Sequence, residues 1–376
     1  MCAKIIHFLR TETVLTAAFV LAVISCFLVP PDAGYAGYID TDTLMTLFSL
    51  MVVMAGFRES GLFDAAAKKL LGRFRSPRGI AFVLISLCFF CSMLITNDVA
   101  LITFVPLALL VLHMADMTEV LCFTVTLMTI AANLGSMLTP IGNPQNLYLY
   151  SRAKFTIAQF LGITLPFAAA SGLLLALCIL FGYAKKKPGT KAFAADSVLP
   201  DGSAGKQNEL PLYIALFLLC LLSVLDLIPT AALFIIVLAA AVIKNRSLLA
   251  KVDYSLLATF VCFFLFIGNM GRIPAFHSFL LSILEGHTRA IAIGASQIIS
   301  NVPAALLLSG FTDEWRELII GTNLGGLGTL IASMASLISY KQVSLHYPQQ
   351  RGRYLLVFTC WNLAFLAALG AIGVLL

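Results

Sequence analysis

Long apolar stretches follow one another along nearly the whole chain, and polar residues are confined to short intervals between them. Most of these stretches exceed about 17 residues, which lets a helix cross roughly 30 Å of hydrocarbon. The period-two alternation that a membrane barrel requires is absent. The pattern therefore predicts an all-α polytopic membrane protein.

The apolar stretches divide into long spans and shorter pairs. The predicted spans, about nine in number, are 11–29, 42–60, 119–150, 156–184, 210–226, 229–243, 252–271, 317–342 and 354–376. Two further segments, 79–112 and 275–311, each read as two halves of about 15 residues around a polar centre, ITND in one and ISNVP in the other. Because such halves are short for a span, we expect two re-entrant helical hairpins, one entering from the cytoplasm and one from outside.

Composition and charge support a membrane protein and give it an orientation. Of the 376 residues, 60% are hydrophobic and 11% charged, which no water-soluble domain of this size tolerates. The net charge of +6 does not predict nucleic-acid binding, because the basic residues lie in short loops between spans. These loops fall on one side, which predicts a cytoplasmic N-terminus in the cell (inner) membrane. The first apolar stretch is too long for a signal peptide, so we expect an uncleaved span.

The chain repeats internally. The segment SMLITNDVALI (92–102) corresponds to SQIISNVPAAL (296–306), and NLGSMLTPIGNPQNL (133–147) corresponds to NLGGLGTLIASMASL (323–337). The spans 42–60 and 252–271 also correspond but cross the membrane in opposite directions, so the repeats are inverted, as in many secondary transporters. We expect a first repeat at 1–184, a hydrophilic cytoplasmic linker at 185–209 and a second repeat at 210–376.

Glycine and proline interrupt the spans 119–150 and 317–342, and a broken helix within a membrane requires a wet cavity for its freed backbone groups. Asp98 and Asn301 look like helix starts at the two hairpin tips. Two tips and two breaks would aim N–H groups at one place, which favours an anion. Freed carbonyls could also bind Na⁺. The side chains that could join them are Thr139, Asn143, Asn146, Ser333 and Ser336, with Thr329 as the counterpart of Thr139.

These hairpin motifs and Gly-rich broken helices resemble those of the ion transporter superfamily, which includes divalent-anion:sodium symporters, citrate transporters and arsenical-pump membrane proteins. The resemblance implies an elevator-type carrier, commonly a homodimer. It implies that the Ser/Thr-Asn pairs at the two tips bind substrate and flank ion sites; these are Thr96, Asn97, Ser300 and Asn301. It also matches Gly142, Asn143 and Asn146 to the Gly-rich segment. Asp98 and Val302 depart from the threonine of the symporters, a pattern closer to the arsenical-pump permeases.

Asp98 is the residue on which the predicted mechanism depends. An ionised carboxylate beside the substrate would repel a dianion, so we expect Asp98 to alternate between protonated and ionised forms and to couple transport to H⁺. Two alternatives stay open: Asp98 binds Na⁺, or it only caps the following helix. The predicted substrate site comprises Thr96, Asn97, Asp98, Ser300 and Asn301. The predicted ion site shares Asn97, Asp98 and Asn301 with it.

The predicted function is secondary active transport of a small inorganic or carboxylate anion coupled to H⁺ or Na⁺. Efflux of arsenite or another metalloid, or cation/H⁺ antiport, is the alternative within the same fold. No cofactor and no metal beyond Na⁺ is expected. An enzyme is not expected, because neither H-E-x-x-H nor G-x-S-x-G with a histidine occurs. The chain has no G-x-x-x-x-G-K-[ST] loop, so a separate ATPase partner is not indicated.

Overall fold

The computed structural model describes residues 12–74, 76–183 and 207–375. Throughout these ranges every regular element is a helix. Six of the described helices are long and apolar enough to cross a membrane, and several shorter apolar helices accompany them. The prediction of an all-helical polytopic membrane protein is confirmed.

The first half of the chain follows the predicted segments closely. Its helices are α2 (Thr13–Leu28), α3 (Thr41–Glu59), α4 (Leu62–Leu71), α5 (Pro77–Cys91), α6 (Asn97–Met114), α7 (Leu121–Ser136), α8 (Pro144–Ala153) and α9 (Ile157–Gly182), with 3₁₀ turns η1 (Ala33–Tyr38), η2 (Thr118–Val120) and η3 (Pro140–Gly142). The segment 79–112 is a helical pair, α5 and α6, joined by a tip at 92–96. Helix α4 was not predicted, because its length of 10 residues is too short to give a span signal.

The second half contains η5 (Gln207–Glu209), α10 (Leu210–Val224), α11 (Thr230–Lys244), η6 (Arg246–Lys251), α12 (Tyr254–Gly271), α13 (Pro274–Leu284), α14 (Thr288–Ile299), α15 (Asn301–Ser309), α16 (Trp315–Leu324), η7 (Leu330–Ala332), α17 (Met334–His346), η8 (Pro348–Gln350) and α18 (Arg351–Leu375). The predicted pair at 275–311 therefore consists of three helices, because Gly286, with φ 71°, ends α13 before α14 begins. Most of the predicted linker, 185–209, lies outside the described residues.

Both predicted broken spans are interrupted in the structure. In the first, α7 ends, η3 follows and α8 begins; in the second, α16, η7 and α17 follow the same order. Asn143 caps α8 by accepting a hydrogen bond from the Asn146 N–H at 3.0 Å, and Pro144 occupies the first helical turn. In the second break, Gly328 has φ 110°, a conformation that favours glycine.

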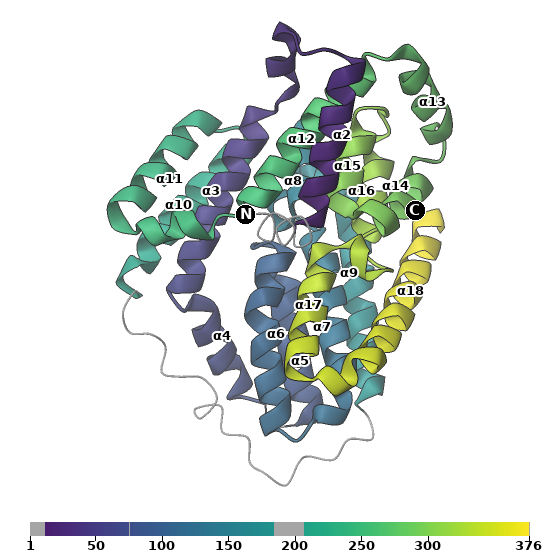
Figure 1. Ribbon diagram of the computed structural model, residues 1–376. Coiled ribbons are helices and arrows are strands. Elements are labelled where there is room, and N and C mark those ends of the chain that lie inside the picture. The colour runs from purple at the N-terminus through teal and green to yellow at the C-terminus, as the bar shows by residue number, and fades with distance from the viewer. Residues whose placement is uncertain (1–11, 75, 184–206, 376) are drawn as a thin grey trace.

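The two helical pairs lie in opposite halves of the molecule. Figure 1 shows α5 and α6 in the lower half and α14 and α15 in the upper half, and each broken helix contributes one segment to each half. Helix α17 packs against α6 and α7, whereas α8 packs against α15 and α16. The second segment of each broken helix is therefore embedded in the group formed by the other half of the chain.

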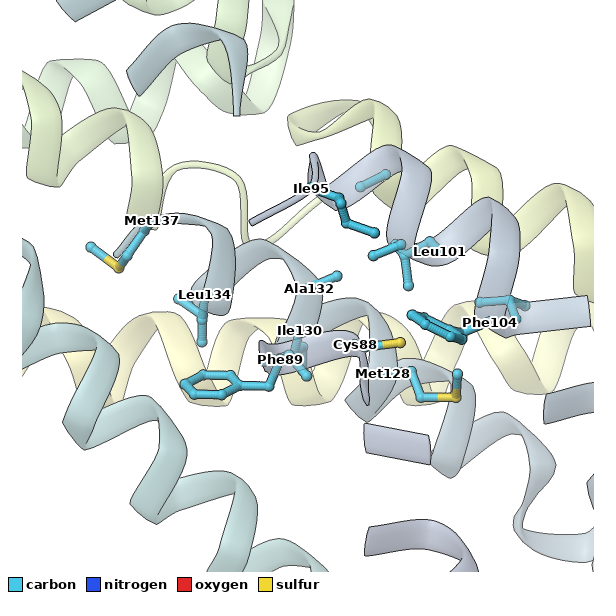
Figure 2. Packing of buried hydrophobic residues seen from close by; sticks show 14 of the residues in the cluster. Cys88, Phe89, Ile95, Leu101, Phe104, Met128, Ile130, Ala132, Leu134 and Met137 are labelled. Carbon is cyan, nitrogen blue, oxygen red and sulfur yellow. The ribbon is translucent and has the colours of Figure 1, made fainter. Parts of the chain in front are cut away.

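The core around the first hairpin is apolar and closely packed. Cys88, Leu101, Phe104 and Met128 are buried where α5, α6 and α7 meet (Figure 2). A Cβ atom on Gly135 would lie 2.1 Å from the Phe89 carbonyl oxygen, so α7 approaches the backbone of α5 more closely than any other residue permits. This contact fixes the end of α7 beside the hairpin tip.

Candidate solute-binding site

The first hairpin tip is joined to both breaks by Asn133, near the end of α7. The Asn97 Nδ2 donates to Asn133 Oδ1 at 2.9 Å, and the Ser333 Oγ donates to the same oxygen at 3.0 Å. The Asn133 Nδ2 donates to the Gly326 carbonyl at 3.3 Å. Because Asn97, Asn133 and Ser333 are all buried, these bonds satisfy groups that water does not reach.

A second set of amides joins the two breaks to each other. The Asn323 Nδ2, near the end of α16, donates to Asn146 Oδ1 at 2.6 Å, and its Oδ1 accepts from Asn143 Nδ2 at 3.2 Å. Asn146 Nδ2 donates to the Met137 carbonyl at 3.2 Å and to the Thr139 carbonyl at 3.4 Å. Together with Asn97, Asn133 and Ser333, these three asparagines form what we call the amide network.

Several contacts occur once in each half of the chain. Position 143 corresponds to 333 and 133 to 323, so the bond from Asn143 to Asn323 has its counterpart in the bond from Ser333 to Asn133. A second such pair follows. The Thr139 hydroxyl donates to the Met93 carbonyl, and the Thr329 hydroxyl donates to the Gln297 carbonyl at 3.1 Å. The two hairpins are therefore attached to the two breaks in the same way.

The second hairpin tip differs from the first in its backbone. Ser300, between α14 and α15, has φ 75°, which is a strained conformation for a residue with a side chain. Its hydroxyl donates to the Ala332 carbonyl at 3.4 Å. Asn301 is buried beside Gly326, where a Cβ atom would lie 3.0 Å from the Asn301 Nδ2. Gly326, which accepts from Asn133, thus lies between Asn133 and Asn301.

Thr96 and Asp98 face a cavity of about 760 Å³ that extends to the C-terminal end of α3. Asp98 is partly buried, and its Oδ1 is buried without a hydrogen-bond partner among the described residues. Arg58 and Asp253 also line this cavity. Asp253 caps α12 by accepting from the Leu256 N–H at 2.9 Å. Among the described residues, by contrast, the Asp98 side chain caps no helix N-terminus.

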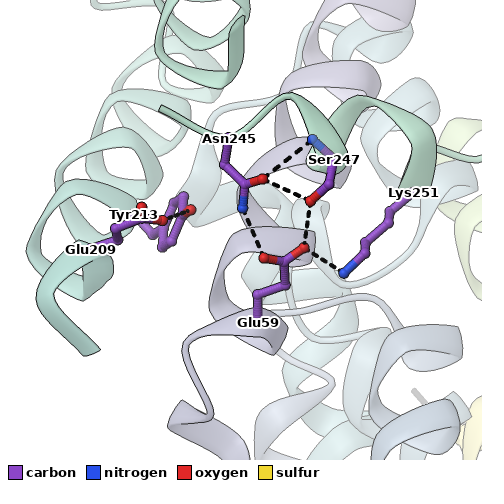
Figure 3. Close-up of polar contacts among 6 residues, drawn as sticks. All are labelled: Glu59, Glu209, Tyr213, Asn245, Ser247 and Lys251. Atoms are coloured by element: carbon purple, nitrogen blue, oxygen red, sulfur yellow. Dashed lines mark hydrogen bonds and ion pairs between the residues drawn. The ribbon is translucent and has the colours of Figure 1, made fainter. Parts of the chain in front are cut away.

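A polar cluster lies at the α3 end of this cavity (Figure 3). The Glu59 carboxylate accepts from Asn245 Nδ2 at 2.8 Å and from Ser247 Oγ at 3.0 Å, and it forms an ion pair with Lys251. Lys251 also lines the cavity. The cluster joins the end of α3 to η6 and keeps the negative charge of Glu59 paired.

Two further cavities continue along α3 toward its N-terminal end. A small cavity of about 30 Å³ is lined by Thr96 and Asn143, together with the apolar side chains of Leu47 and Leu50. Beyond it lies a cavity of about 360 Å³, and Leu147 borders both. In this conformation, apolar side chains therefore separate the large cavity beside Asp98 from the cavity at the other end of α3.

The structure brings most predicted site residues together, by three kinds of contact. Asn97, Asn143, Asn146 and Ser333 belong to the amide network, and Asn301 lies beside it. Thr96 and Asp98 face the large cavity, while Thr139, Thr329 and Ser300 bind backbone carbonyls at the tips and breaks. Gly142 allows η3 to approach Ser136, whose carbonyl oxygen would lie 2.1 Å from a Cβ atom. Ser336 is buried, and its hydroxyl has no partner among the described residues.

The site predicted from the sequence does not include Asn133, Asn323 or Gln297. Asn133 and Asn323 open the two NLG segments, so the repeat itself was the available signal. Gln297 aligns with Met93, and the repeat gives no sign of its role. In the described part of the chain, no lysine, arginine or histidine takes part in the amide network, so side-chain amides and the Ser333 hydroxyl supply its donors.

Broken helices within a membrane bundle are tolerated where protein buries them or where they line a water-filled cavity, and paired broken helices are typical of membrane transport proteins. Residues 5–312 match the citrate transporter family model, and the chain belongs to this family. It is 33% identical over 324 residues to an uncharacterized transporter of Methanocaldococcus jannaschii, covering 85% of each chain. It is 30% identical over 328 residues to the inner membrane protein YbiR of Escherichia coli, covering 85% of this chain and 84% of YbiR.

A more distant similarity extends to a silicon efflux transporter of rice, Oryza sativa subsp. japonica. The identity is 32% over 202 residues, which is 53% of this chain and 39% of the rice protein. The comparisons therefore identify a membrane transporter, and the multi-pass fold agrees with the inner-membrane relative.

Proposed function

We propose that the chain is a secondary active transporter that moves a small anion across the cytoplasmic membrane by elevator-type alternating access. The observation that carries this proposal is the amide network, which links one hairpin tip to both broken helices and ends beside the other tip. A solute bound there would contact elements from both halves of the chain. The large cavity reaches Thr96 and Asp98 from one end of α3 only, which fits one state of an alternating carrier.

Helix N-termini favour an anion at this place. Four helices, α6, α8, α15 and α17, begin at the tips and breaks, at Asn97, Pro144, Asn301 and Met334. Pro144 and Pro303 carry no N–H, and the N–H groups of Asp98 and Asn146 donate to side-chain amide oxygens. The remaining N–H groups of these first turns carry partial positive charge. An inorganic or carboxylate anion of small size would meet several of these groups at once.

The proposed architecture comprises two inverted repeats, about nine spans, two re-entrant hairpins and two broken helices. The contacts that recur in both halves and the opposite placement of the two hairpins in Figure 1 support this arrangement. The N-terminus is proposed to be cytoplasmic, because the basic loops predict it. A homodimer is proposed from the resemblance alone.

Asp98 is proposed to carry the coupling proton. Its Oδ1 is buried beside the cavity and finds no hydrogen-bond partner in the part of the chain that the structure describes. A carboxylate in that place is favoured when it is protonated or paired with a cation. Proton exchange with the side of the membrane at the α3 C-terminal end would proceed through the cavity. Coupling to Na⁺ is the alternative, with Asp98 as a ligand.

Efflux of an uncharged metalloid acid is a second candidate, and two observations favour it. The amide network contains no cationic side chain, and the one charged group at the tip is the carboxylate of Asp98. Such a site suits a neutral hydroxylated solute whose O–H groups donate to Asp98. The similarity to the rice silicon efflux transporter is consistent with this candidate.

Ligand-dependent thermal stability of the purified protein tests the function. Citrate, dicarboxylates, sulfate, phosphate and arsenite are added singly, with and without Na⁺ and at two pH values. The true substrate raises the unfolding temperature, because it binds the folded state only. Asn97→Ala should abolish this rise, and a substrate that stabilises the variant as well as the wild type would show that the site lies elsewhere.

Transport in proteoliposomes tests the role of Asp98. Asp98→Asn keeps the size of the side chain and removes its titration, so we expect uptake that no longer responds to an imposed pH gradient. Substrate binding should persist in this variant. Full pH-dependent transport by Asp98→Asn would refute the proton role.

A further inference from the structure

Gln297, on the last turn of α14, forms hydrogen bonds with backbone groups that the second break leaves without helical partners. Its Nε2 donates to the Gly325 carbonyl at 2.9 Å and to the Leu327 carbonyl at 3.0 Å. Its Oε1 accepts from the Thr329 N–H at 2.9 Å. One side-chain amide therefore joins the hairpin to three positions of the broken segment, and the Thr329 hydroxyl adds a bond to the Gln297 carbonyl.

The orientation of this amide follows from its surroundings. The Thr329 N–H needs an acceptor, whereas Gly325 and Leu327 present acceptors only. A third carbonyl oxygen, that of Ile293, lies 3.1 Å from the same nitrogen. The NH₂ group, which carries the positive end of the amide dipole, thus lies at the focus of three carbonyl oxygens. Oxygen clusters of this kind are the ligands that hard cations prefer in proteins.

In the first half of the chain, the donor to the carbonyls of the break comes from the broken helix, on α8, and not from the hairpin. Met137 corresponds to Leu327, and its carbonyl accepts from Asn146 Nδ2 at 3.2 Å. The side-chain amide therefore stands at different positions of the repeat in the two halves: on the broken helix in the first half and on the hairpin in the second. Met93 stands where the second half has Gln297, and Ser336, which is shorter, stands where the first half has Asn146. In both halves a side-chain NH₂ group therefore donates hydrogen bonds to the carbonyl oxygens of the break.

We infer that the side-chain NH₂ groups of Gln297 and Asn146 occupy the positions that a coupling cation would otherwise take among the backbone carbonyls of the two breaks. These carbonyl oxygens therefore bind no Na⁺. This inference rests on the proposed carrier function and removes the carbonyls of the two breaks as places for a coupling cation. With these carbonyls filled, Asp98 is left as the group that takes up the coupling ion, and H⁺ needs no further oxygen ligands there. The inference is an alternative to the expectation that freed carbonyls bind Na⁺.

Removing the amide should create a Na⁺ site. In Gln297→Ala the carbonyls of Gly325 and Leu327 lose their donor, and a cation can enter between them. We expect NaCl, compared with equal concentrations of KCl or choline chloride, to raise the unfolding temperature of this variant by about 2 °C or more. The wild type should show no such difference between salts. Met93→Ala, at the corresponding position, is the matched control. It should also show no difference between salts, because the Asn146 NH₂ group still donates to the Met137 carbonyl.

A second variant tests whether the Gln297 NH₂ group takes the place of a cation or only completes backbone hydrogen bonds. Gln297→Lys places an ammonium group among the same carbonyls but offers no acceptor to Thr329. We expect it to be more stable than Gln297→Ala in Na⁺-free buffer and to lose the response to NaCl. If Gln297 acts only by completing the backbone hydrogen bonds, the Gln297→Lys ammonium will still stabilise the fold by donating to these carbonyls, but Gln297→Ala will show no NaCl response that Gln297→Lys could lose.

Two results would overturn the inference. One is a folded Gln297→Ala variant with no Na⁺-specific stabilisation. The other is a Na⁺-specific rise in the wild type that Asn97→Ala and Asn143→Ala leave in place, which would put an ion in the second half despite Gln297. This second measurement needs no variant of Gln297 to fold. Either result would leave the carrier function standing, whereas failure to transport any solute would remove that function independently of Na⁺.

Discussion

Replacing Asn133 tests whether the amide network holds the two halves together. The side chain makes three hydrogen bonds between elements, with Asn97, Ser333 and the Gly326 carbonyl, at distances of 2.9 to 3.3 Å. Asn133→Ala removes all three and leaves their partners buried in place. The variant keeps the helix-forming character of α7, because alanine has the highest helix propensity.

The size of the effect can be worked from these bonds. At about 0.6–1 kcal/mol for each hydrogen bond between elements in a membrane protein, three bonds contribute about 2–3 kcal/mol. The Asn97 amide and the Gly326 carbonyl then lack partners, which places the loss toward the upper figure. We expect the free energy of unfolding to fall by this amount and the unfolding temperature to fall by about 3–6 °C.

Asn362 provides a matched control. It lies on α18 and is as buried as Asn133. Within the described residues, its Nδ2 donates only to the Phe358 carbonyl of its own helix, at 2.9 Å. Asn362→Ala removes the same atoms but no bond between elements, so its cost should stay below about 1 kcal/mol. Thermal unfolding of both variants in detergent, followed by circular dichroism, gives the comparison. Equal losses for Asn133→Ala and Asn362→Ala would refute the reasoning.

Two further predictions concern packing and charge. Gly135→Ala should prevent stable folding or lower the unfolding temperature by several degrees, since its Cβ would lie 2.1 Å from the Phe89 carbonyl oxygen. Gly162→Ala should be neutral in the same thermal assay, because its Cβ would meet no described atom within 4 Å beyond the adjacent backbone of its own helix. The hydrogen bond from Arg272 lowers the pKa of Asp32, so this pair stabilises the folded state above the unfolded pKa and is lost as the pH falls below about 4. Thermal unfolding between pH 6 and 3 should show a small acid-dependent loss in the wild type that Asp32→Asn lacks, and identical pH profiles would contradict this.

The sequence predicted the elements whose signal is local. Apolar length located the long helices, and glycine and proline located the two breaks, because those residues act on their own stretch of backbone. The hairpin tip at 92–96 followed from ITND for the same reason. One local signal was not used. Helices α13 and α14 were merged into one half of a pair, although the residues between them, EGHTR (285–289), are polar and include Gly286, whose φ is positive.

The candidate site was predicted in part. Repetition pointed to Asn97 and Asn301, because two equivalent polar residues among apolar neighbours are improbable without a shared purpose. It did not reveal that Asn133 and Asn323 connect the two halves, since hydrogen bonds across 193 or 180 positions depend on the fold. Gln297 could not be found by matching the repeats at all. Its counterpart is Met93, and the exchange of the amide with Asn146 is visible only in three dimensions.

Folding of each half of the chain should require the other half. Helix α8 packs among α15 and α16, and α17 packs among α6 and α7. Neither half of the polypeptide can bury its own broken helix, so an isolated half would expose in the lipid the polar backbone that its counterpart normally shields. Two separately synthesised fragments, divided between 184 and 206, should accumulate only when both are made in the same cell.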